Sequence, residues 1–129
     1  MAKKSRTRVV LVVDDDAAVR GALRFALEVE GFEVRDYDSP VALLSDRNMP
    51  PLGCFVIDYR MPVMDGLELV AVLRERGIGA PAIIITGRTN KELEAQAAKL
   101  GVRQVLEKPL SDGALVAAIR SALPLPAAG

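Results

Sequence analysis

Short apolar runs alternate with longer stretches whose apolar residues recur at helical spacing, and this alternation limits the folds open to the 129-residue chain. Each apolar run predicts a strand and each longer stretch a helix. The predicted strands cover 8–13, 33–37, 53–57, 82–85 and 103–106. The predicted helices cover 17–30, 41–46, 65–76, 89–100 and 112–123, counting their caps. This order predicts one parallel sheet with helices on both faces and right-handed crossovers.

The ends and the polarity of these elements refine the prediction. The runs 9–13 and 83–85 are continuously apolar, as expected of central parallel strands. The more polar run 33–37 fits a sheet edge. Asp65 and Glu68 form a capping-box pattern ahead of the third helix, and Ser111 is the expected cap of the last one.

The composition restricts the chemistry. With 17 basic and 17 acidic residues the formal net charge is +0, which argues against nucleic acid as the main partner of this domain. The chain contains no histidine, so the usual general base and the usual zinc ligand are both missing. The single cysteine, Cys54, stands in an apolar run and is expected to be a buried, reduced thiol.

We expect residues 1–7 to be a disordered basic lead, 8–123 to form a single domain, and 124–129 to be a flexible tail or linker stub. The apolar run after the basic lead is too short for a signal peptide or a membrane span. The sequence therefore predicts a cytoplasmic protein with no membrane partner.

Polar side chains follow four of the predicted strands at the point where each strand ends. They are Asp14, Asp15 and Asp16 after the first strand, Asp58 after the third, Thr86 and Gly87 after the fourth, and Glu107, Lys108 and Pro109 after the fifth. In doubly wound sheets, functional sites lie beyond these carboxyl ends. Asp16 is the exception, because a helix cap is the simplest interpretation of its position.

Carboxylates gathered at one edge raise each other's pKa, and a hard divalent cation relieves their repulsion. Mg²⁺ suits a site with few carboxylates and several retained waters. With Mg²⁺ bound, one carboxylate can attack an activated phosphoryl group and form an acyl phosphate. Lys108 and the Thr86 hydroxyl can then contact the oxygens of that group.

These residues, in this order, resemble the receiver domain of bacterial two-component response regulators. The motifs that carry the resemblance are Val12-Val13-Asp14-Asp15, the run from Ile57 to Gly66, Thr86-Gly87 and Lys108-Pro109. The resemblance implies a flavodoxin-like (βα)5 doubly wound parallel sheet in a single domain, with strand order 2-1-3-4-5. The run 58–66 is most similar to that of nitrogen-fixation-type regulators, in which a helix-turn-helix domain follows. We expect the chain to be a stand-alone receiver or an isolated N-terminal domain.

The resemblance also implies a role for each matching residue. Asp58 matches the phosphoacceptor, Thr86 the switch hydroxyl and Lys108 the lysine that pairs with the phosphate. The implied Mg²⁺ ligands are Asp15, Asp58 and the backbone carbonyl of Arg60, with Asp14 acting through water. The Lys108–Pro109 bond is expected to be cis.

The implied partner is a histidine kinase or a phosphotransfer protein, and a small acyl phosphate is an alternative donor. The domain would catalyse its own phosphorylation and slow dephosphorylation, so it is a signalling phosphoacceptor rather than an enzyme. Phosphate would draw Thr86 inward and shift the face made by 89–100, 103–106 and 112–123. That face is also a candidate surface for a homodimer.

Two residues depart from the family pattern. Val105 stands where most receivers have a Tyr or Phe that moves inward with the hydroxyl, so the signal must be carried in another way or be weaker. Leu110 stands where Phe often follows the proline. Arg60 and Arg88 flank the site, and our hypothesis is that one of them shields the acyl phosphate from water.

Three other functions compete with this one. A phosphatase of the haloacid dehalogenase type would use Asp14-Asp15-Asp16 as its nucleophile motif and leave Asp58 idle. A flavin-binding protein would need a Ser-, Thr- and Gly-rich loop after the first strand, where this chain is acidic. A degenerate receiver would act only by docking, and Val105 keeps that alternative open.

Overall fold

The computed structural model of the chain describes residues 9–49, 53–110 and 113–123. Its strands are β1 (Val9–Val13), β2 (Glu33–Tyr37), β3 (Cys54–Asp58), β4 (Ala82–Thr86) and β5 (Val102–Glu107). Its helices are α1 (Ala17–Val29), α2 (Pro40–Leu44), α3 (Gly66–Glu75), α4 (Lys91–Lys99) and α5 (Ala114–Ala122). No helix in these ranges has both the length and the apolar character that crossing a bilayer requires. The predicted elements are all present, with ends that differ by at most two residues.

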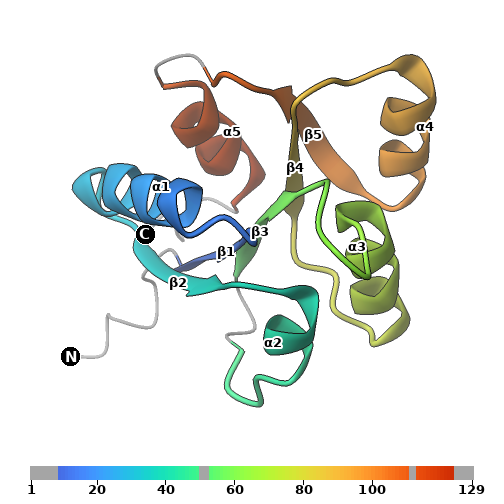
Figure 1. Ribbon diagram of the computed structural model, residues 1–129, viewed down its shortest axis with the longest axis horizontal. Coiled ribbons are helices and arrows are strands. Elements are labelled where there is room, and N and C mark those ends of the chain that lie inside the picture. The colour runs from blue at the N-terminus through green and yellow to red at the C-terminus, as the bar shows by residue number, and fades with distance from the viewer. Residues whose placement is uncertain (1–8, 50–52, 111–112, 124–129) are drawn as a thin grey trace, which may run out of the picture.

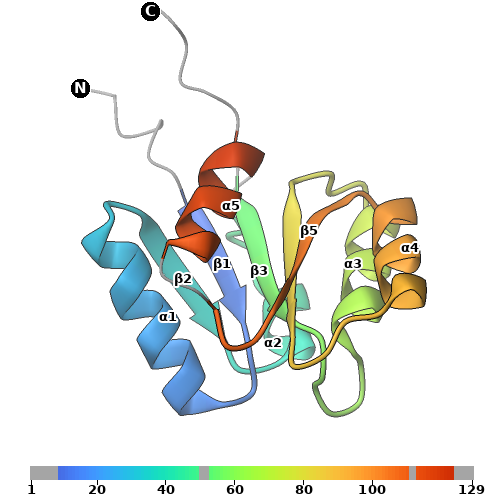
Figure 2. The same cartoon turned by 90° about the horizontal axis from the view of Figure 1, so that it is seen from above.

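The strands form one parallel sheet in the order β2-β1-β3-β4-β5, which confirms the predicted topology. Figures 1 and 2 show α1 and α5 on one face of the sheet and α2, α3 and α4 on the other. The three inner strands are the most apolar, and β2, which was expected at an edge, lies there.

Each face of the sheet carries its own core. Alternate residues of β1 illustrate this, because Val10 and Val12 pack beneath α1 and α5, while Leu11 and Val13 pack toward α2, α3 and α4. A strand that buries both faces must be apolar at every position, which explains the continuous runs in the sequence. Cys54 in β3 is buried as expected, and burial raises the pKa of its thiol to about 12.

The start of α5 differs from the prediction. The residue at the N-cap is Gly113, which has φ 79° and makes no side-chain cap hydrogen bond, so the helix begins at Ala114. A left-handed backbone at this point favours glycine. Residues 111 and 112, and the predicted lead and tail at 1–7 and 124–129, lie outside the described residues.

β1 and β3 lie side by side where the connections of the sheet change face, and we call the region beyond the carboxyl ends of these strands the crevice. The chain leaves β1 toward α1 on one face and leaves β3 toward α3 on the opposite face. The two connecting loops therefore diverge beyond the carboxyl ends of these strands, which is where ligands bind in open α/β sheets.

Candidate functional site

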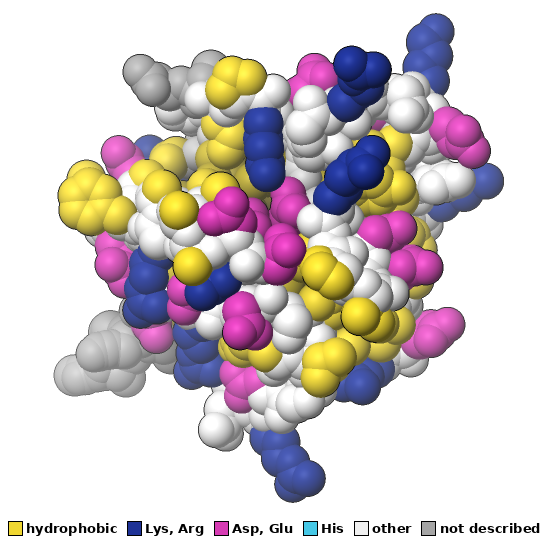
Figure 3. Space-filling view, in the orientation of Figure 1, with side chains coloured by type: hydrophobic (Ala, Val, Ile, Leu, Met, Phe, Trp, Pro, Cys, Tyr) yellow, Lys and Arg dark blue, Asp and Glu magenta, His cyan; other side chains and the backbone are white. Residues whose placement is uncertain are grey.

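Three carboxylates meet in this crevice. Oxygen atoms of Asp14, Asp15 and Asp58 lie within 4.8 Å of one another. Asp14 and Asp58 are 3% and 7% exposed, whereas Asp15 faces solvent. Figure 3 looks onto the edge where the strands end and shows acidic side chains gathered near its centre with basic ones beside them. The prediction that these residues converge is therefore met in the geometry.

Short-range hydrogen bonds fix the turn that carries Asp14 and Asp15. The amide of Asp16 donates to Asp14 Oδ1 at 2.9 Å, and the Asp16 side chain caps α1 by accepting from the amides of Ala18 and Val19. The Arg20 guanidinium donates to the Asp14 backbone carbonyl at 2.9 Å. Asp16 is thus a cap, as predicted. Arg20 was not singled out in the sequence, because an arginine in the second turn of a helix looks like an ordinary surface residue.

Asp58 is held by a close approach between the end of β3 and the start of α3. The amide of Gly66 donates to the Tyr59 carbonyl at 2.8 Å. A Cβ atom at position 66 would lie 2.7 Å from the Asp58 carbonyl oxygen, a backbone atom that cannot move aside cheaply. The predicted capping box of Asp65 and Glu68 is present and starts α3 at this point. Gly66 therefore has a steric role that the capping pattern alone did not reveal.

Lys108 supplies the positive charge at the site. Its Nζ atom lies 3.1 Å from Asp58 Oδ1, and the side chains are 38% and 9% exposed. The Lys108 amide donates to the Thr86 carbonyl at 2.8 Å, which anchors the end of β5 to β4. The Lys108–Pro109 peptide bond is cis. The lysine pairs with Asp58 and not with Asp14, which weakens the phosphatase interpretation.

The Thr86 hydroxyl is directed to its own loop. It is 2% exposed, donates to the Arg88 carbonyl at 3.1 Å and accepts from the Arg88 amide at 3.3 Å. Among the described residues, no hydrogen bond joins Thr86 to Asp58. The loop is held further by Thr89, whose amide donates to the Glu107 carboxylate at 3.3 Å and whose hydroxyl donates to Glu94 at 3.0 Å.

The electrostatics of the crevice favour a cation. Burial is the main cause that raises the pKa of Asp58, and the hydrogen bond from Lys108 opposes it. Burial also raises the pKa of Asp14, against the hydrogen bond from the Asp16 amide. The charges of Asp14 and Asp15 raise the pKa of Asp58 further, and those of Asp15 and Asp16 raise the pKa of Asp14. Hard oxygen donors that lie this close and are partly desolvated fit a magnesium ion, which would stabilise their ionised forms.

The remaining predicted residues lie around this centre. Arg60 and Arg88 are exposed, and neither belongs to an ion pair of the described residues. Gly87 is exposed in the loop that follows β4. Val105 pairs in register with Ile84 and is partly buried against the core beneath α2, α3 and α4. The position opposite α4 is therefore filled by a small branched side chain.

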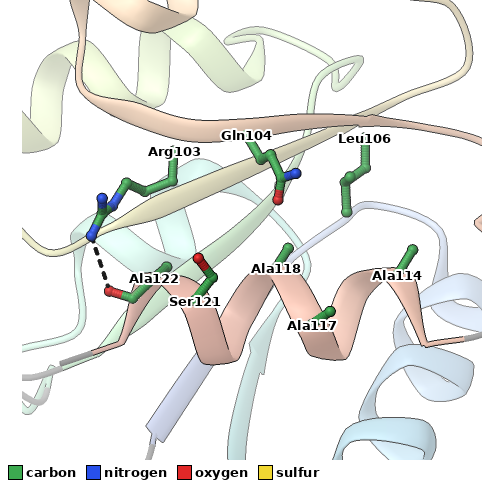
Figure 4. A pocket seen from close by; sticks show the side chains of 8 residues that line it. All are labelled: Arg103, Gln104, Leu106, Ala114, Ala117, Ala118, Ser121 and Ala122. Atoms are coloured by element: carbon green, nitrogen blue, oxygen red, sulfur yellow. Dashed lines mark hydrogen bonds between the residues drawn. The ribbon is translucent and has the colours of Figure 1, made fainter. Parts of the chain in front are cut away.

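A separate hollow of about 510 Å³ lies between β5 and α5. In Figure 4, Arg103, Gln104 and Leu106 of β5 point toward alanines and Ser121 of α5, and Arg103 donates to the Ala122 carbonyl. It shares no residue with the acidic crevice, so it is not part of the site.

The profile of the response regulator receiver domain family matches residues 10–120. The chain belongs to this family. It is 44% identical over 115 residues to the transcriptional regulatory protein FixJ of Azorhizobium caulinodans, covering 88% of the chain and 54% of that protein. It is 36% identical over 120 residues to the response regulator protein TodT of Pseudomonas putida, covering 93% and 53%. The receiver domain therefore spans about half the length of these relatives.

Solved receiver structures agree with this assignment. FixJ-N superposes with a TM-score of 0.78 at 37% identity, over 89% of this chain and 92% of that one. The Vibrio cholerae chemotaxis protein CheY4 superposes with a TM-score of 0.80 at 25% identity, over 91% and 99%. These matches confirm the predicted flavodoxin-like fold and a receiver domain of the FixJ type, a domain of two-component signal transduction.

Proposed function

We propose that this receiver takes a phosphoryl group on Asp58 in a Mg²⁺-dependent reaction. The observation that carries the proposal is the position of Asp58, which is in contact with Lys108 at 3.1 Å and clustered with two further carboxylates. A buried carboxylate with a cation on one side and a metal site on the other can act as a nucleophile toward phosphorus.

Asp15, Asp58 and the backbone carbonyl of Arg60 would hold the ion, with Asp14 acting through water. When bound, Mg²⁺ supplies charge neutralisation for the phosphoryl oxygens and for the clustered carboxylates. Asp14 and Asp15 are held for this task by the hydrogen bonds of the turn after β1.

The residues of the chain perform the rest of the transfer. An Asp58 carboxylate oxygen forms the new bond to phosphorus, while the bond from phosphorus to the donor breaks and its electron pair leaves with the donor. Lys108 moves from Asp58 to the incoming phosphoryl oxygens and neutralises their charge. Asp58 enters as a carboxylate, so no general base is needed, which suits a chain without histidine.

The acyl phosphate is lost again when water attacks phosphorus, so the domain also catalyses its own slow dephosphorylation. Arg88 follows Thr86 by two residues, Arg60 follows Asp58 by two, and both are exposed. Either guanidinium can shield the phosphoryl group, and Arg88→Ala should then shorten the half-life of the phosphorylated form.

The structure suggests how the added charge is passed on without an aromatic ring at position 105. A phosphoryl oxygen competes with the Arg88 carbonyl for the Thr86 hydroxyl, because a charged acceptor makes the stronger hydrogen bond. When Thr86 turns, the loop that it braces moves together with Thr89. The contacts of Thr89 with Glu107 and Glu94 connect that loop to β5 and α4.

The partners of this chain follow from its family. The phosphodonor is a cytoplasmic histidine kinase or phosphotransfer protein, and the surface of α4, β5 and α5 passes the signal on, through a homodimer or an output domain. FixJ is named as a transcriptional regulatory protein, so control of transcription is the proposed output in a longer protein.

Incubation with acetyl phosphate and Mg²⁺, followed by intact-protein mass spectrometry, tests the central proposal. We expect one phosphoryl adduct, which is lost when Asp58 is replaced by Asn or when EDTA removes the metal. An adduct that persists in Asp58→Asn would assign the phosphoryl group to another residue.

A further inference from the structure

A small apolar hollow opens beside the acidic crevice. Its walls are the loop after β3, including Met61, Val63 and Met64, and the start of α2, including Pro40 and Val41. Its volume is about 160 Å³. Asp15 belongs to its lining as well as to the carboxylate cluster, so the hollow lies next to the cluster.

The hollow is built to receive an apolar group of limited size. Methionine side chains adapt to different shapes and favour apolar contacts. A water molecule takes up about 30 Å³ in the liquid, so a hollow of about 160 Å³ has room for about five groups of that size. Two neighbours of the opening are themselves unusually exposed for large apolar residues, Val41 at 62% and Val63 at 98%.

The loop that forms one wall has a fixed shape. Val63 has φ 72°, and the amide of Met64 donates to the Pro62 carbonyl at 2.8 Å, which closes a three-residue turn. A left-handed backbone at a branched residue is strained. Met61 and Met64 are partly buried against the core beneath α2, α3 and α4, whereas Val63 is exposed, so the turn fixes the shape of this apolar wall.

We infer that this hollow binds the hydrocarbon chain of an acyl phosphate whose phosphoryl group lies in the crevice. The inference rests on the proposed function of Asp58 and names a class of small-molecule donor for it: acyl phosphates with a chain longer than that of acetyl phosphate. In the transfer, the bond between the donor's carboxylate oxygen and phosphorus breaks. An Asp58 oxygen bonds to phosphorus, and the electron pair of the broken bond stays on the donor's carboxylate. The chain of this carboxylate contacts the hollow until the product dissociates.

Butyryl phosphate and acetyl phosphate are the probes that test this inference. Their leaving carboxylates have nearly the same acidity, so a difference in rate reports on binding of the chain. Each methylene removed from water is worth a factor of about four, so the two additional methylenes of butyryl phosphate predict a gain of about fifteenfold. We expect Asp58 to be phosphorylated about fifteenfold faster per molar donor by butyryl phosphate at subsaturating concentration.

A charge in the hollow should remove this preference. Val41→Asp places a carboxylate at the opening, at the second residue of α2, where an acidic side chain suits the helix. The variant should keep its rate with acetyl phosphate and lose the gain with butyryl phosphate. Val29→Asp, at an equally exposed valine on α1 (66%), is the matched control and should keep the gain.

A second measurement is independent of phosphoryl transfer. Butylphosphonate cannot transfer its phosphoryl group, and with Mg²⁺ it should shift the methyl NMR signals of Met61 and Met64 but not that of Met49, while methylphosphonate should shift none. Equal rates with both acyl phosphates and unshifted methionine signals would overturn the inference. A side chain of a protein donor would then be the candidate occupant of the hollow. The proposed function fails separately, through the absence of any adduct with acetyl phosphate.

Discussion

The Lys108 Nζ atom lies 3.1 Å from Asp58 Oδ1, so the residue proposed to accept the phosphoryl group is already paired with a cation. Lys108→Ala should slow phosphorylation by acetyl phosphate about a hundredfold, because it removes a charge that stabilises the transferring oxygens. Lys99→Ala on α4 is the control and should keep the wild-type rate. Time-resolved intact mass measures both. A Lys108→Ala variant as fast as wild type would show that the ion pair has no part in the reaction.

Gly66 should tolerate no side chain. Gly66→Ala forces a Cβ to 2.7 Å from the Asp58 carbonyl, and we expect it to destabilise the domain by about 2 kcal/mol and to slow phosphorylation. Gly21→Ala is the matched control, because nothing lies within 4 Å of its Cβ position in α1. It should stabilise the domain by about 0.5–1 kcal/mol through helix propensity. Urea unfolding measures both, and equal effects would contradict the close approach.

The Asp14 carboxylate should destabilise the folded domain when no divalent cation is present. Burial raises its pKa in the folded state, so its ionised form is disfavoured there. The protonated form carries no such cost. The destabilisation by Asp14 is therefore absent below the ordinary pKa of 3.8 and is complete once the pH has risen through the raised value. Asp14→Asn should therefore raise the free energy of unfolding at pH 7, measured by urea unfolding, and the gain should vanish as the pH falls toward 3.8.

Magnesium provides the control for that measurement. Mg²⁺ should stabilise the wild type more than Asp14→Asn, because the variant has lost part of the charge that the ion neutralises. A variant less stable than the wild type at pH 7 without Mg²⁺ would contradict this description of the crevice.

Phosphorylation should loosen the loop between β4 and α4. Hydrogen exchange, measured with beryllofluoride as a stable mimic of the phosphoryl group, should increase at 87–93. Glu107→Ala removes the acceptor for the Thr89 amide and should produce part of that increase without the mimic. Thr86→Ala should abolish the response to the mimic. An unchanged loop both in the wild type with the mimic and in Glu107→Ala would place the output elsewhere.

The order of the elements could be read from the sequence because inner strands buried on both faces must be continuously apolar, as 9–13 and 83–85 are. The convergence of Asp14, Asp15, Asp58 and Lys108 followed from topology, since parallel strands end at one edge. The exact residue at which a helix starts could not always be read in this way. The start of α5 depends on the left-handed turn at Gly113, and a serine nearby gave the competing signal.

The same limit applies to the direction of polar side chains. The sequence placed Thr86 at the site but could not show that its hydroxyl bonds to Arg88, because several acceptors compete for one rotatable donor. Arg20 and Gly66 were missed for a related reason. The contacts that place them at the site are with backbone carbonyls, which leave no mark on the residue types that they touch.

Identification of the phosphorylated residue tests the proposal most directly. Borohydride reduces an aspartyl phosphate to homoserine, so treatment with acetyl phosphate and Mg²⁺, then borohydride, then peptide mass spectrometry locates the acceptor. The proposed chemistry predicts homoserine at position 58, and none at 14 or 15. Homoserine at position 14, or an unmodified Asp58 in protein that carries a phosphoryl adduct, would contradict it.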